Sequence, residues 1–472
     1  MSKRLRYLVT LLKEVFSPEI INSIALKTKF KIRKGKITPD MFVALCVLYG
    51  RDLCQSSLIR LSTRLNIKED IEISPQALDQ RFNKHAVSFL RQIFERLIHK
   101  HNNETLDDLP LRKMLFANIK VVDSTVIQLP ENLAVAYKGT GGDGSKSAVK
   151  IQLEYEVLSG KFLACQINSG SSSDMAYLPY SEAKIEKGEL HLKDLGYFKT
   201  DHLQKIHQAG AFYISKIKKT ASAYLKDPNP ELKRDGTINK KKAYKKIDIQ
   251  QIAQPLAEGQ SIECLDTYMG ITKLKSRLIV TKLTKECKQN REKKHRLAIR
   301  KGKRIRQDND DAWNSINTYI TNIPQEIATA EQIHNLYTLR WQIENMFKVW
   351  KSIFGMAGIK KVKVERFECF LYGRLIELLL AASIVSTSKV IAVEEGIQPL
   401  SELKTFSIVN EYLEGSTPST FKTDNTLIAF IDKTIQRIIK HGLKSRKKGT
   451  VYYGVILEFL RCNSLTEGIK TA

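Results

Sequence analysis

Three acidic residues stand where metal-dependent chemistry would need them. Asp123 lies in VVDST at the end of the first expected strand, Asp194 lies in LKDLGY on or just after the fourth, and Glu344 lies in a helix farther on. In open α/β sheets, sites form beyond the carboxyl ends of adjacent strands, and a helix over that edge can add a third acid. Clustered carboxylates suit Mg²⁺ or Mn²⁺, and two ions about 3.5–4 Å apart promote phosphodiester cleavage or exchange. The pattern therefore predicts a two-metal phosphodiester site.

The helix around Glu344, YTLRWQIENMFKVWK, surrounds its acid with basic and aromatic groups. Tyr337, Arg340 and Lys351 lie at offsets of −7, −4 and +7 from Glu344, which places all four on one stripe of a continuous α-helix. We expect Glu344 to hold metal, and Tyr337, Arg340, Lys348 and Lys351 to bind phosphates. The alternative is a surface helix with an Arg340–Glu344 ion pair, which leaves the two upstream acids unexplained.

The charge balance indicates a polyanionic partner. Lys and Arg number 77 against 50 Asp and Glu, which gives a net charge of +27 over 472 residues. Such an excess favours nucleic acid, most simply double-stranded DNA. The cations are spread along the chain rather than clustered beside an apolar segment, so no membrane partner is expected.

Three further patterns limit the class of protein. The apolar stretch FLYGRLIELLLAASIVSTS carries Arg374 and Glu377, so we expect a buried helix and not a membrane span. No phosphate-loop pattern is present, so no nucleotide triphosphate is expected. The seven cysteines have no metal-ligand spacing, which favours reduced thiols in a cytoplasmic protein.

The N-terminal part, residues 1–110, is predicted to be a helical DNA-binding domain because its apolar residues recur every three or four positions. SSLIRLSTRLNI and SPQALDQRFNK form a candidate helix-turn-helix, in which Gln76, Gln80 and Arg81 would face DNA. The alternative is a plain helical bundle with solvated polar faces.

The centre of the chain reads as an α/β domain. Residues 111–218 give the order strand, strand, strand, helix, strand, helix, strand, which a ribonuclease-H-like catalytic core has. We expect the closing catalytic helix within 326–360, beginning near Thr329 with a Thr329–Gln332 capping box and running unbroken to about Phe354. Residues 361–472 are predicted to be a helical region that could mediate dimerisation.

Residues 219–325 are too many for a loop, so we expect a β-rich insertion subdomain within this core. IDIQQIAQPL, SIECLDTYMG and KLKSRLIVTKL are its expected strands. A basic arm follows, from Lys285 to Arg306, in which Arg300, Lys301 and Arg304 would contact the DNA backbone. The alternative for this arm is a solvated face.

Several of these segments carry a family resemblance. The Y-R-E-K helix, DSTVIQLP at the first acid, KGTGGDG, KIQLEYEVLSG, the LGYF after Asp194 and TNIP resemble a DDE transposase of the insertion-sequence-four group, in its Bacillus-type branch. The resemblance covers about residues 70–380. It implies a ribonuclease-H-like domain with a β-rich insertion, and cut-and-paste transposition by metal-dependent nicking, hairpin formation and strand transfer at terminal inverted repeats.

The resemblance also implies partners. The active species would be a homodimer holding two element ends and then target DNA, in a bacterial cytoplasm and on the nucleoid. An aromatic residue of the insertion would stack on a base flipped out near the hairpin, and Trp313 is the main candidate, with Trp341 a second. The alternative for Trp313 is a core or lid aromatic.

Two other functions remain open at this stage. A structure-specific nuclease could use the same core without strand transfer. A catalytically silent, transposase-derived DNA-binding repressor is the other, although the retained acids count against it.

Overall fold

The computed structural model describes residues 3–31, 35–103, 114–141, 145–235, 237–239, 242–300, 302, 310–397, 399–444, 456 and 458–460. The chain divides into two units. The helix-rich unit comprises residues 1–112, 123–173 and 342–448, and the sheet-rich unit comprises residues 113–122, 174–341 and 449–472. Each unit is described by itself.

The helix-rich unit is built from most of the chain's long helices and one hairpin. The hairpin strands are β2 (Ser147–Glu156) and β3 (Phe162–Ser169), which pair antiparallel. The helices are α1 (Lys3–Phe16), α2 (Pro18–Lys27), α3 (Pro39–Val47), α4 (Leu58–Glu69), α5 (Pro75–Arg81), α6 (Lys84–Asn103), α13 (Trp341–Ser352), α14 (Val364–Glu394), α15 (Glu402–Glu414) and α16 (Asp424–His441). The helical character predicted for both ends of the chain is therefore confirmed for the described residues.

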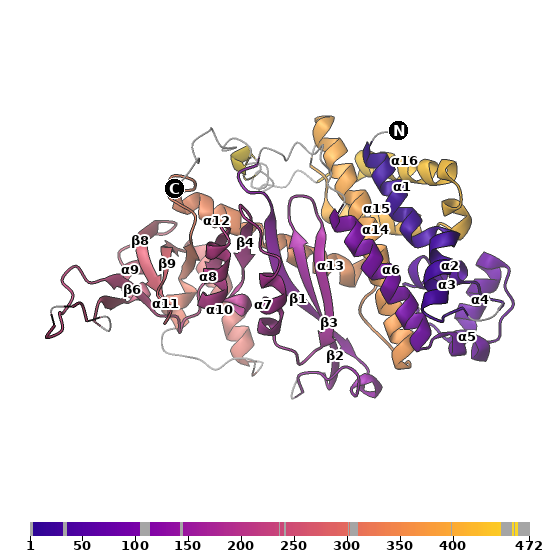
Figure 1. Cartoon of the computed structure of the whole chain (residues 1–472), viewed down its shortest axis with the longest axis horizontal. Coiled ribbons are helices and arrows are strands. Elements are labelled where there is room, and N and C mark those ends of the chain that lie inside the picture. The colour runs from indigo at the N-terminus through magenta and orange to yellow at the C-terminus, as the bar shows by residue number, and fades with distance from the viewer. Residues whose placement is uncertain are drawn as a thin grey trace. The chain divides into compact units, whose positions relative to one another are not determined.

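Helix α14 forms the centre of this unit. It packs against α6 and α3, and Figure 1 shows α1, α6 and α14 side by side. By length and composition α14 could cross a membrane, but 72% of its most apolar window is buried within the protein. Arg374 and Glu377 are both fully buried. The Arg374 guanidinium donates to the Glu377 side chain and to the carbonyls of Cys46 (2.8 Å) and Val47 (2.6 Å). The prediction of a buried helix is confirmed.

The sheet-rich unit contains a mixed sheet with helices on both faces. Its strands are β1 (Ile119–Leu129, shared with the other unit), β4 (Leu190–Lys193), β5 (Phe212–Lys216), β6 (Ala223–Lys226), β7 (Tyr244–Ile247), β8 (Ser261–Met269), β9 (Leu274–Lys282) and β10 (Ile316–Thr321). Its helices are α7 (Leu178–Glu182), α8 (Thr200–Gln208), α9 (Ile249–Ala253), α10 (Lys285–Arg300), α11 (Asp310–Asn314) and α12 (Ala330–Thr338).

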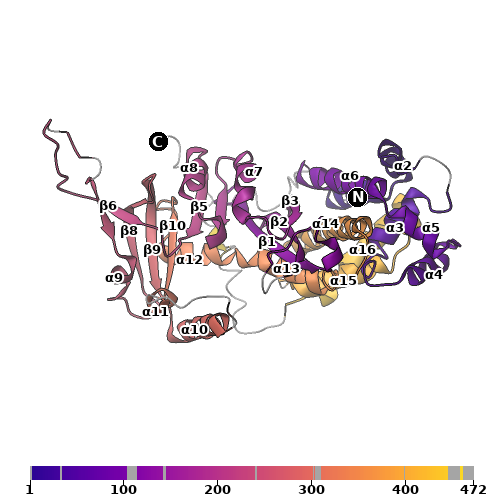
Figure 2. The ribbon, with the colours of Figure 1, turned by 90° about the horizontal axis from the view of Figure 1, so that it is seen from below.

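The strands of this unit follow the order β1-β4-β5-β10-β9-β8-β6-β7. Figure 2 shows β5, β10, β9, β8 and β6 in that sequence. Strands β1, β4 and β5 are parallel, whereas β10 runs antiparallel to both β5 and β9. In the helix-rich unit the order is β3-β2-β1. Along the chain the elements are β1, β2, β3, α7, β4, α8 and β5. This is the predicted order, so the α/β fold with a ribonuclease-H-like core is confirmed.

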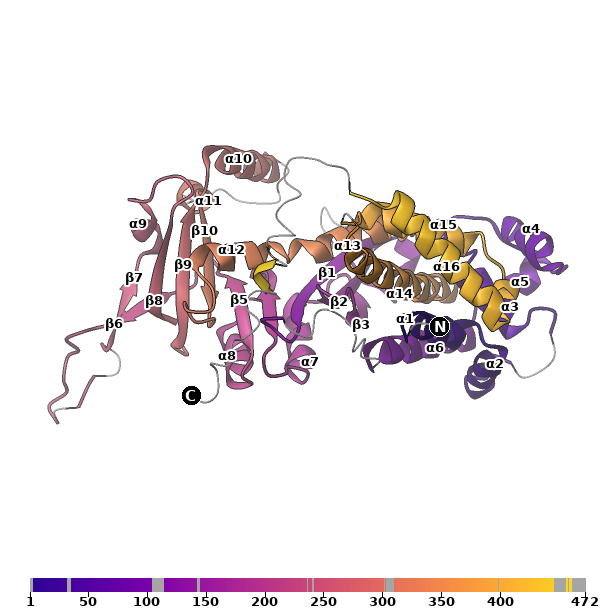
Figure 3. The same cartoon turned by 90° about the horizontal axis from the view of Figure 1, so that it is seen from above.

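The two faces of this sheet differ in what covers them. Successive residues of a strand point to opposite faces. Leu274, Leu278 and Val280 of β9 point into an apolar core with α8 and α9. Tyr319 of β10 points to the other face, where its ring centroid lies 4.9 Å from that of Tyr337 in α12. Figure 3 shows α12 crossing the strands. This second face of the sheet, on which α12 packs, is called the α12 face below.

One expected strand is a helix. The segment IDIQQIAQPL forms α9, because the Asp248 carboxylate accepts hydrogen bonds from the backbone N–H groups of Gln250 (2.9 Å) and Gln251 (3.4 Å) and so caps a helix start. Ile249 and Ala253 then lie one turn apart and bury together in the core. The other two strands predicted for the insertion, β8 and β9, are confirmed.

The expected continuous helix from Thr329 to Phe354 is wrong. The capping box between Thr329 and Gln332 is present, but α12 ends at Thr338 and α13 begins at Trp341. The backbone N–H groups of Leu339 and Arg340 bond to the carbonyls of Leu336 and Tyr337, both at 3.1 Å, so each bond spans only three residues. This tighter turn interrupts the α-helical ladder.

Candidate active site

Asp194 lies where a strand of the parallel part of the sheet ends. It directly follows Lys193, the last residue of β4, which is buried between β1 and β5. Asp194 is also the N-cap of a short 3-10 turn, Leu195–Tyr197. Its side chain is 36% exposed, so it can meet a ligand from solvent. The predicted place of this acid at a strand end is confirmed.

Two residues of the Y-R-E-K pattern meet Asp194. The Tyr337 hydroxyl donates to Asp194 Oδ1 at 3.2 Å, with the carbonyl of Lys193 at 3.4 Å. Arg340 Nη1 lies 4.0 Å from Asp194 Oδ2. Tyr337 and Arg340 are both buried. Burial, reinforced by the charge of Asp194, raises the pKa of Tyr337 well above its ordinary value, so the hydroxyl stays a donor. Tyr337 therefore holds Asp194, the candidate catalytic residue, in place. The contact predicted from the sequence between Tyr337 and a DNA phosphate stays a prediction.

Asp123 lies in the middle of β1 and not at its end, as the sequence had suggested. The strand continues to Leu129 because its later residues alternate between buried and exposed positions in the helix-rich unit. The parallel pairing of β1 with β4 nevertheless stops at Val121, two residues before Asp123. The half-buried Asp123 carboxylate accepts a hydrogen bond from the backbone N–H of Ser124 at 2.8 Å. Asp123 therefore follows the end of the parallel pairing, although not of the strand.

Glu344 lies in the first turn of α13 and is half-buried. Lys348, one turn later, is exposed, with its Nζ 3.4 Å from Asn345 Oδ1, and Lys351 is exposed in the last turn. The single stripe predicted for these residues is wrong. Tyr337 belongs to α12 and Arg340 to the turn, so only Glu344, Lys348 and Lys351 share a helix.

The three acids are divided between the units: Asp123 and Glu344 belong to the helix-rich unit and Asp194 to the sheet-rich unit. In the part of the chain that the structure describes, no three His, Cys, Asp or Glu side chains already lie grouped as ligands of one metal ion. The structure thus brings together Asp194, Tyr337 and Arg340.

A buried polar network supports the strand that carries Asp194, and sequence analysis did not find it. Lys120 Nζ of β1 lies 2.6 Å from Glu189 Oε1, just before β4, and His191 Nε2 lies 3.2 Å from Glu189 Oε2. Burial alone would raise the pKa of Glu189, but the hydrogen bonds of His191 and Lys120 outweigh it and lower the pKa to about 2. The charged Glu189 therefore ties β1 to β4 below Asp194. The alternation of Glu189 and His191 around the start of β4 is a signal in the sequence that could have indicated this network.

The candidate helix-turn-helix consists of α4 and α5, which pack together. Ser57 and Ser74 cap the two helices, each accepting from a backbone N–H at 3.2 Å. Gln76 and Gln80 are exposed on α5, whereas Arg81 is half-buried and directs Nη2 toward the carbonyl of Ile37 at 3.4 Å. The two helices are confirmed, and their contact with DNA stays a prediction.

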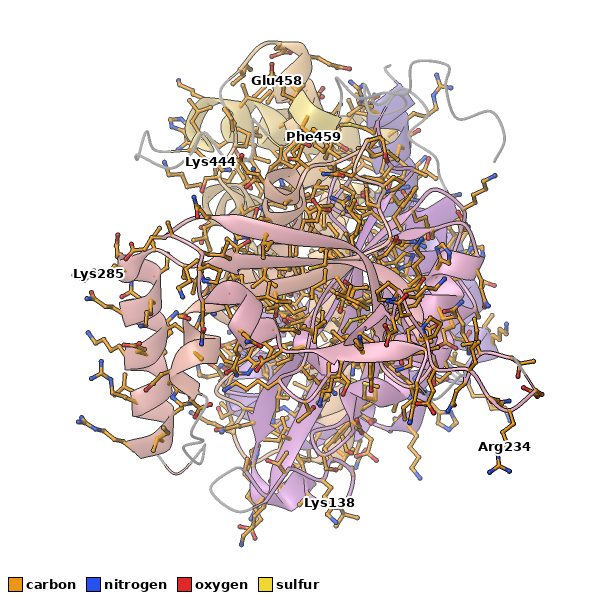
Figure 4. The ribbon with its side chains drawn as sticks, turned by 90° about the vertical axis from the view of Figure 1, so that its left-hand side faces the viewer. Lys138, Arg234, Lys285, Lys444, Glu458 and Phe459 are labelled. Carbon is orange, nitrogen blue, oxygen red and sulfur yellow. The ribbon has the colours of Figure 1, made fainter. Side chains whose placement is uncertain are left out.

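The described part of the basic arm is the helix α10, and Lys285 marks its first turn in Figure 4. Arg291 anchors α10 to β10 through the carbonyl of Ile316 (2.8 Å) and Oδ1 of Asn317 (2.7 Å). Arg300 is exposed at the end of the helix. Lys301 and Arg304 lie outside the described residues.

The two aromatic candidates have different surroundings. Trp313 of α11 is partly buried and packs against the apolar core of the sheet-rich unit. Trp341 is 51% exposed at the start of α13, with the Arg340 guanidinium 5.3 Å from its ring centroid. Packing against the core therefore explains part of the role of Trp313. The ring of Trp341 is the more accessible of the two to a flipped base.

The family is decided by comparison with known proteins. The family described as "Transposase DDE domain" matches residues 115–380. The chain belongs to the DDE transposases. It is 42% identical over 448 residues to the transposase of insertion sequence element IS1151 from Clostridium perfringens, covering 95% of both chains. It is 33% identical over 448 residues to that of IS231D from Bacillus thuringiensis subsp. finitimus, covering 94% of both chains.

The prediction of an insertion-sequence transposase of the Bacillus-type branch is therefore confirmed, and with it DNA transposition as the function and a DDE enzyme as its agent. Transposases of this family use divalent metal ions. Among solved structures, a piggyBac transposase synaptic complex with hairpin DNA aligns with a TM-score of 0.47 and 12% identity, covering 98% of this chain and 87% of that one.

Proposed function

We propose that this transposase carries out cut-and-paste transposition of an insertion sequence, by strand nicking, hairpin formation and strand transfer at terminal inverted repeats. The observation that supports it most is the contact of Asp194 with Tyr337 and Arg340. These three residues come from two of the family's motifs, and the fold brings them together from positions far apart in the chain. A transposase site needs an acid that is held in place and yet reachable, and Asp194 meets both requirements.

The residues fit divalent metal ions. Asp194 keeps a solvent-accessible carboxylate while Tyr337 fixes one of its oxygens, and carboxylate oxygens are the donors that Mg²⁺ and Mn²⁺ prefer. Asp123, Asp194 and Glu344 would hold two such ions. Bound there, the ions would activate the attacking oxygen and stabilise the leaving one.

The remaining candidates would position DNA. Lys348 and Lys351 are exposed on the helix of Glu344, and their ammonium groups would bind phosphates beside the scissile bond, together with Arg340. The flipped base would stack on Trp313 or on the more exposed Trp341. Gln76, Gln80 and Arg81 would read the element end, and Arg300, Lys301 and Arg304 would contact the backbone.

The partners follow from this reaction. The substrate is double-stranded DNA, first the terminal inverted repeats and then the target. Transposition joins two ends, so a homodimer would hold one end per protomer, with the helices of 361–472 as the candidate interface. The site of action would be the bacterial cytoplasm, on the nucleoid.

Cleavage of a labelled DNA that carries the gene's own flanking inverted repeats tests the proposal. Wild type in Mg²⁺ should give hairpin-ended and joined products. Asp123→Ala, Asp194→Ala and Glu344→Ala should each abolish cleavage and retain DNA binding. Glu331→Ala is the control, because Glu331 is an exposed acid in the first turn of α12.

Other outcomes would overturn it. Metal-dependent cleavage in any of the three acid variants would break the triad. Wild-type binding without cleavage in Mg²⁺ or Mn²⁺ would favour the repressor, and nicks without hairpins or joined products would favour the nuclease.

A further inference from the structure

We propose that the outer strands of the insertion carry a second DNA surface, which binds the phosphates of duplex DNA extending from Asp194. This inference rests on the proposed function and adds a contact to it. The surface is formed by three tyrosines and three lysines, here called the Tyr–Lys face: Tyr224, Tyr244, Tyr268, Lys226, Lys273 and Lys275.

Strand register places five of these residues on one side of the sheet. Tyr224 of β6 pairs with Tyr268 of β8, and Lys226 of β6 pairs with Tyr244 of β7. Tyr268 also pairs with Lys275 of β9. Directly paired residues point to the same face of a sheet. Lys273, in the turn before β9, joins them by contact with a tyrosine ring.

The face is directed away from the apolar core. Ala223, Met269 and Leu274, each next in sequence to a member of the face, point into the core with α8 and α9. Lys226 and Lys275 are exposed, Tyr224, Tyr244 and Lys273 are half-exposed, and Tyr268 is 9% exposed. The sequence therefore alternates between core residues and a cationic, hydroxyl-bearing surface, which a fold requirement alone does not explain.

The contacts within the face favour phosphates over bases. The rings of Tyr244 and Tyr268 meet edge to face at 4.9 Å. Lys273 Nζ lies 2.9 Å from the ring centroid of Tyr224, and Lys226 Nζ lies 5.6 Å from that of Tyr268. Rings occupied by each other and by ammonium groups offer little surface for stacking. What remains accessible is cations and hydroxyl donors, which suit a sugar-phosphate backbone.

Among the residues that the structure describes, one acid touches this surface. Asp266 lies 2.7 Å from Lys275, and both side chains are about two-thirds exposed. Exposed pairs of this kind are weak and are screened by salt, so a phosphate can replace the carboxylate. The described contacts of Lys226 and Lys273 are with tyrosine side chains and not with carboxylates, so their charge is available to an incoming anion.

The Tyr–Lys face lies on the same side of the sheet as Asp194's partners. Lys275, Arg277 and Ile279 alternate along β9 and so share a face, and Ile279 pairs with Tyr319. Tyr319 contacts Tyr337, which hydrogen-bonds to Asp194. Both features therefore belong to the α12 face of one unit.

The spacing fits a continuous duplex. From β5, beside Asp194's strand, to β6 is four strand steps, or roughly 19 Å at about 4.8 Å per step. This corresponds to the rise of about six base pairs at 3.4 Å each. The face would thus bind phosphates about half a helical turn from the scissile bond.

The test compares two triple variants with the same change in charge. Lys226→Gln/Lys273→Gln/Lys275→Gln removes the cations of the face. Lys233→Gln/Lys242→Gln/Lys245→Gln is the control: Lys233 and Lys242 lie in the β6–β7 loop, at whose outer end Figure 4 shows Arg234, and Lys245 faces the opposite side of β7 from Tyr244. The probe is a duplex carrying one terminal repeat with its flank. Its dissociation constant is measured from about 50 to 200 mM salt, together with its backbone footprint.

The face variant should bind about tenfold more weakly, with a salt slope lower by about two to three. It should also lose footprint protection roughly six base pairs from the cleavage site, whereas the control should keep it. Tyr244→Phe, which keeps the ring and removes the hydroxyl, should weaken the same footprint position without changing the melting temperature.

Equal losses in both triple variants, or an unchanged footprint, would overturn the proposal. A loss confined to single-stranded DNA would instead indicate base stacking. The dissociation constant and the footprint can both be measured without cleavage. A wild type that binds DNA but does not cut it would therefore refute the proposed function, and DNA binding by the Tyr–Lys face could still be tested.

Discussion

At the scale of single residues, the clearest feature is that Asp194 does not stand alone. Its Oδ1 accepts from Tyr337 at 3.2 Å, while its Oδ2 lies 4.0 Å from Arg340. The hydrogen bond from the Tyr337 hydroxyl and the nearby guanidinium both restrict the orientation of this carboxylate. The Y and R of the Y-R-E-K pattern thus act here on an acid of a different segment, about 140 residues upstream, as positioning groups.

Replacing Tyr337 with Phe should therefore affect metal use more than DNA binding. The ring stays and only the donor is lost, and hydrogen bonds to charged groups contribute about 1.5–3 kcal/mol, less here because Asp194 is partly exposed. We expect the Mg²⁺ concentration for half-maximal cleavage to rise about tenfold, with unchanged affinity for the duplex. Titration of cleavage against Mg²⁺ measures this.

Tyr319→Phe provides a matched control, because its hydroxyl meets His334 at 3.0 Å and not Asp194. Weaker duplex binding by Tyr337→Phe at an unchanged metal requirement would contradict positioning and support the direct phosphate contact predicted from sequence.

At the scale of elements, the break between α12 and α13 decides how the site residues are divided. The N-terminus of α12 is fixed by a reciprocal capping box, in which the Thr329 hydroxyl accepts from the N–H of Gln332 (3.3 Å) and the Gln332 side chain accepts from the N–H of Thr329 (2.8 Å). Tyr337 lies in the last turn of the same short helix. Secure capping of α12 therefore contributes to holding Tyr337 against Asp194.

Thr329→Ala should loosen α12 locally. Loss of an N-cap costs about 1 kcal/mol, so the backbone amides of α12 should exchange about fivefold faster with solvent. Hydrogen exchange followed by mass spectrometry measures this. Thr338→Ala is the control, since that hydroxyl only bonds back to the carbonyl of Asn335. Equal protection in Thr329→Ala and wild type would show that tertiary packing alone holds the helix.

At the scale of the whole molecule, two buried acids give the units opposite responses to pH. Glu189 in the sheet-rich unit has a pKa lowered to about 2 by the hydrogen bonds that outweigh its burial. Glu377 in the helix-rich unit has a pKa raised to about 8 by burial, which exceeds the effect of Arg374. Stability falls with decreasing pH when the folded pKa is lowered, and with increasing pH when it is raised.

The free energy of unfolding should therefore depend on pH in two separate windows. The stability that Glu189 contributes is present above its unfolded pKa of about 4.3 and is lost as the pH falls toward 2. The stability linked to Glu377 is lost as the pH rises from about 4.3 through 8. Melting temperatures from pH 2 to 9 measure both windows.

Glu189→Gln should reduce the pH dependence of the melting temperature only between about pH 2 and 4.3. Glu377→Gln should reduce it only between about pH 4.3 and 8. A wild-type pH profile retained in both variants would contradict the assignment of these windows to the two acids.

Residue types and their spacing were enough to predict the features that depend on local chemistry. These features are the strand-end position of Asp194, the helical position of Glu344, the Thr329–Gln332 capping box, the strand and helix order of the core and the buried apolar helix α14. All of them follow from residue types and spacing within a few turns. These patterns involve residues that are close together in the chain, so they can be recognised without knowing the fold.

Which groups come into contact became known only from the folded chain. The break at Leu339 and Arg340, the helix α9 in place of a strand, the central position of Asp123 in β1 and the Lys120–Glu189 pair were not predictable. Each depends on partners far away in sequence: Tyr337 turns toward Asp194, Ile249 and Ala253 turn into a core built by β9, and Glu189 stays charged in the interior because Lys120 and His191 lie beside it. The local propensities for helix and strand differ little at these positions. Burial against residues that are remote in the sequence therefore selects one conformation.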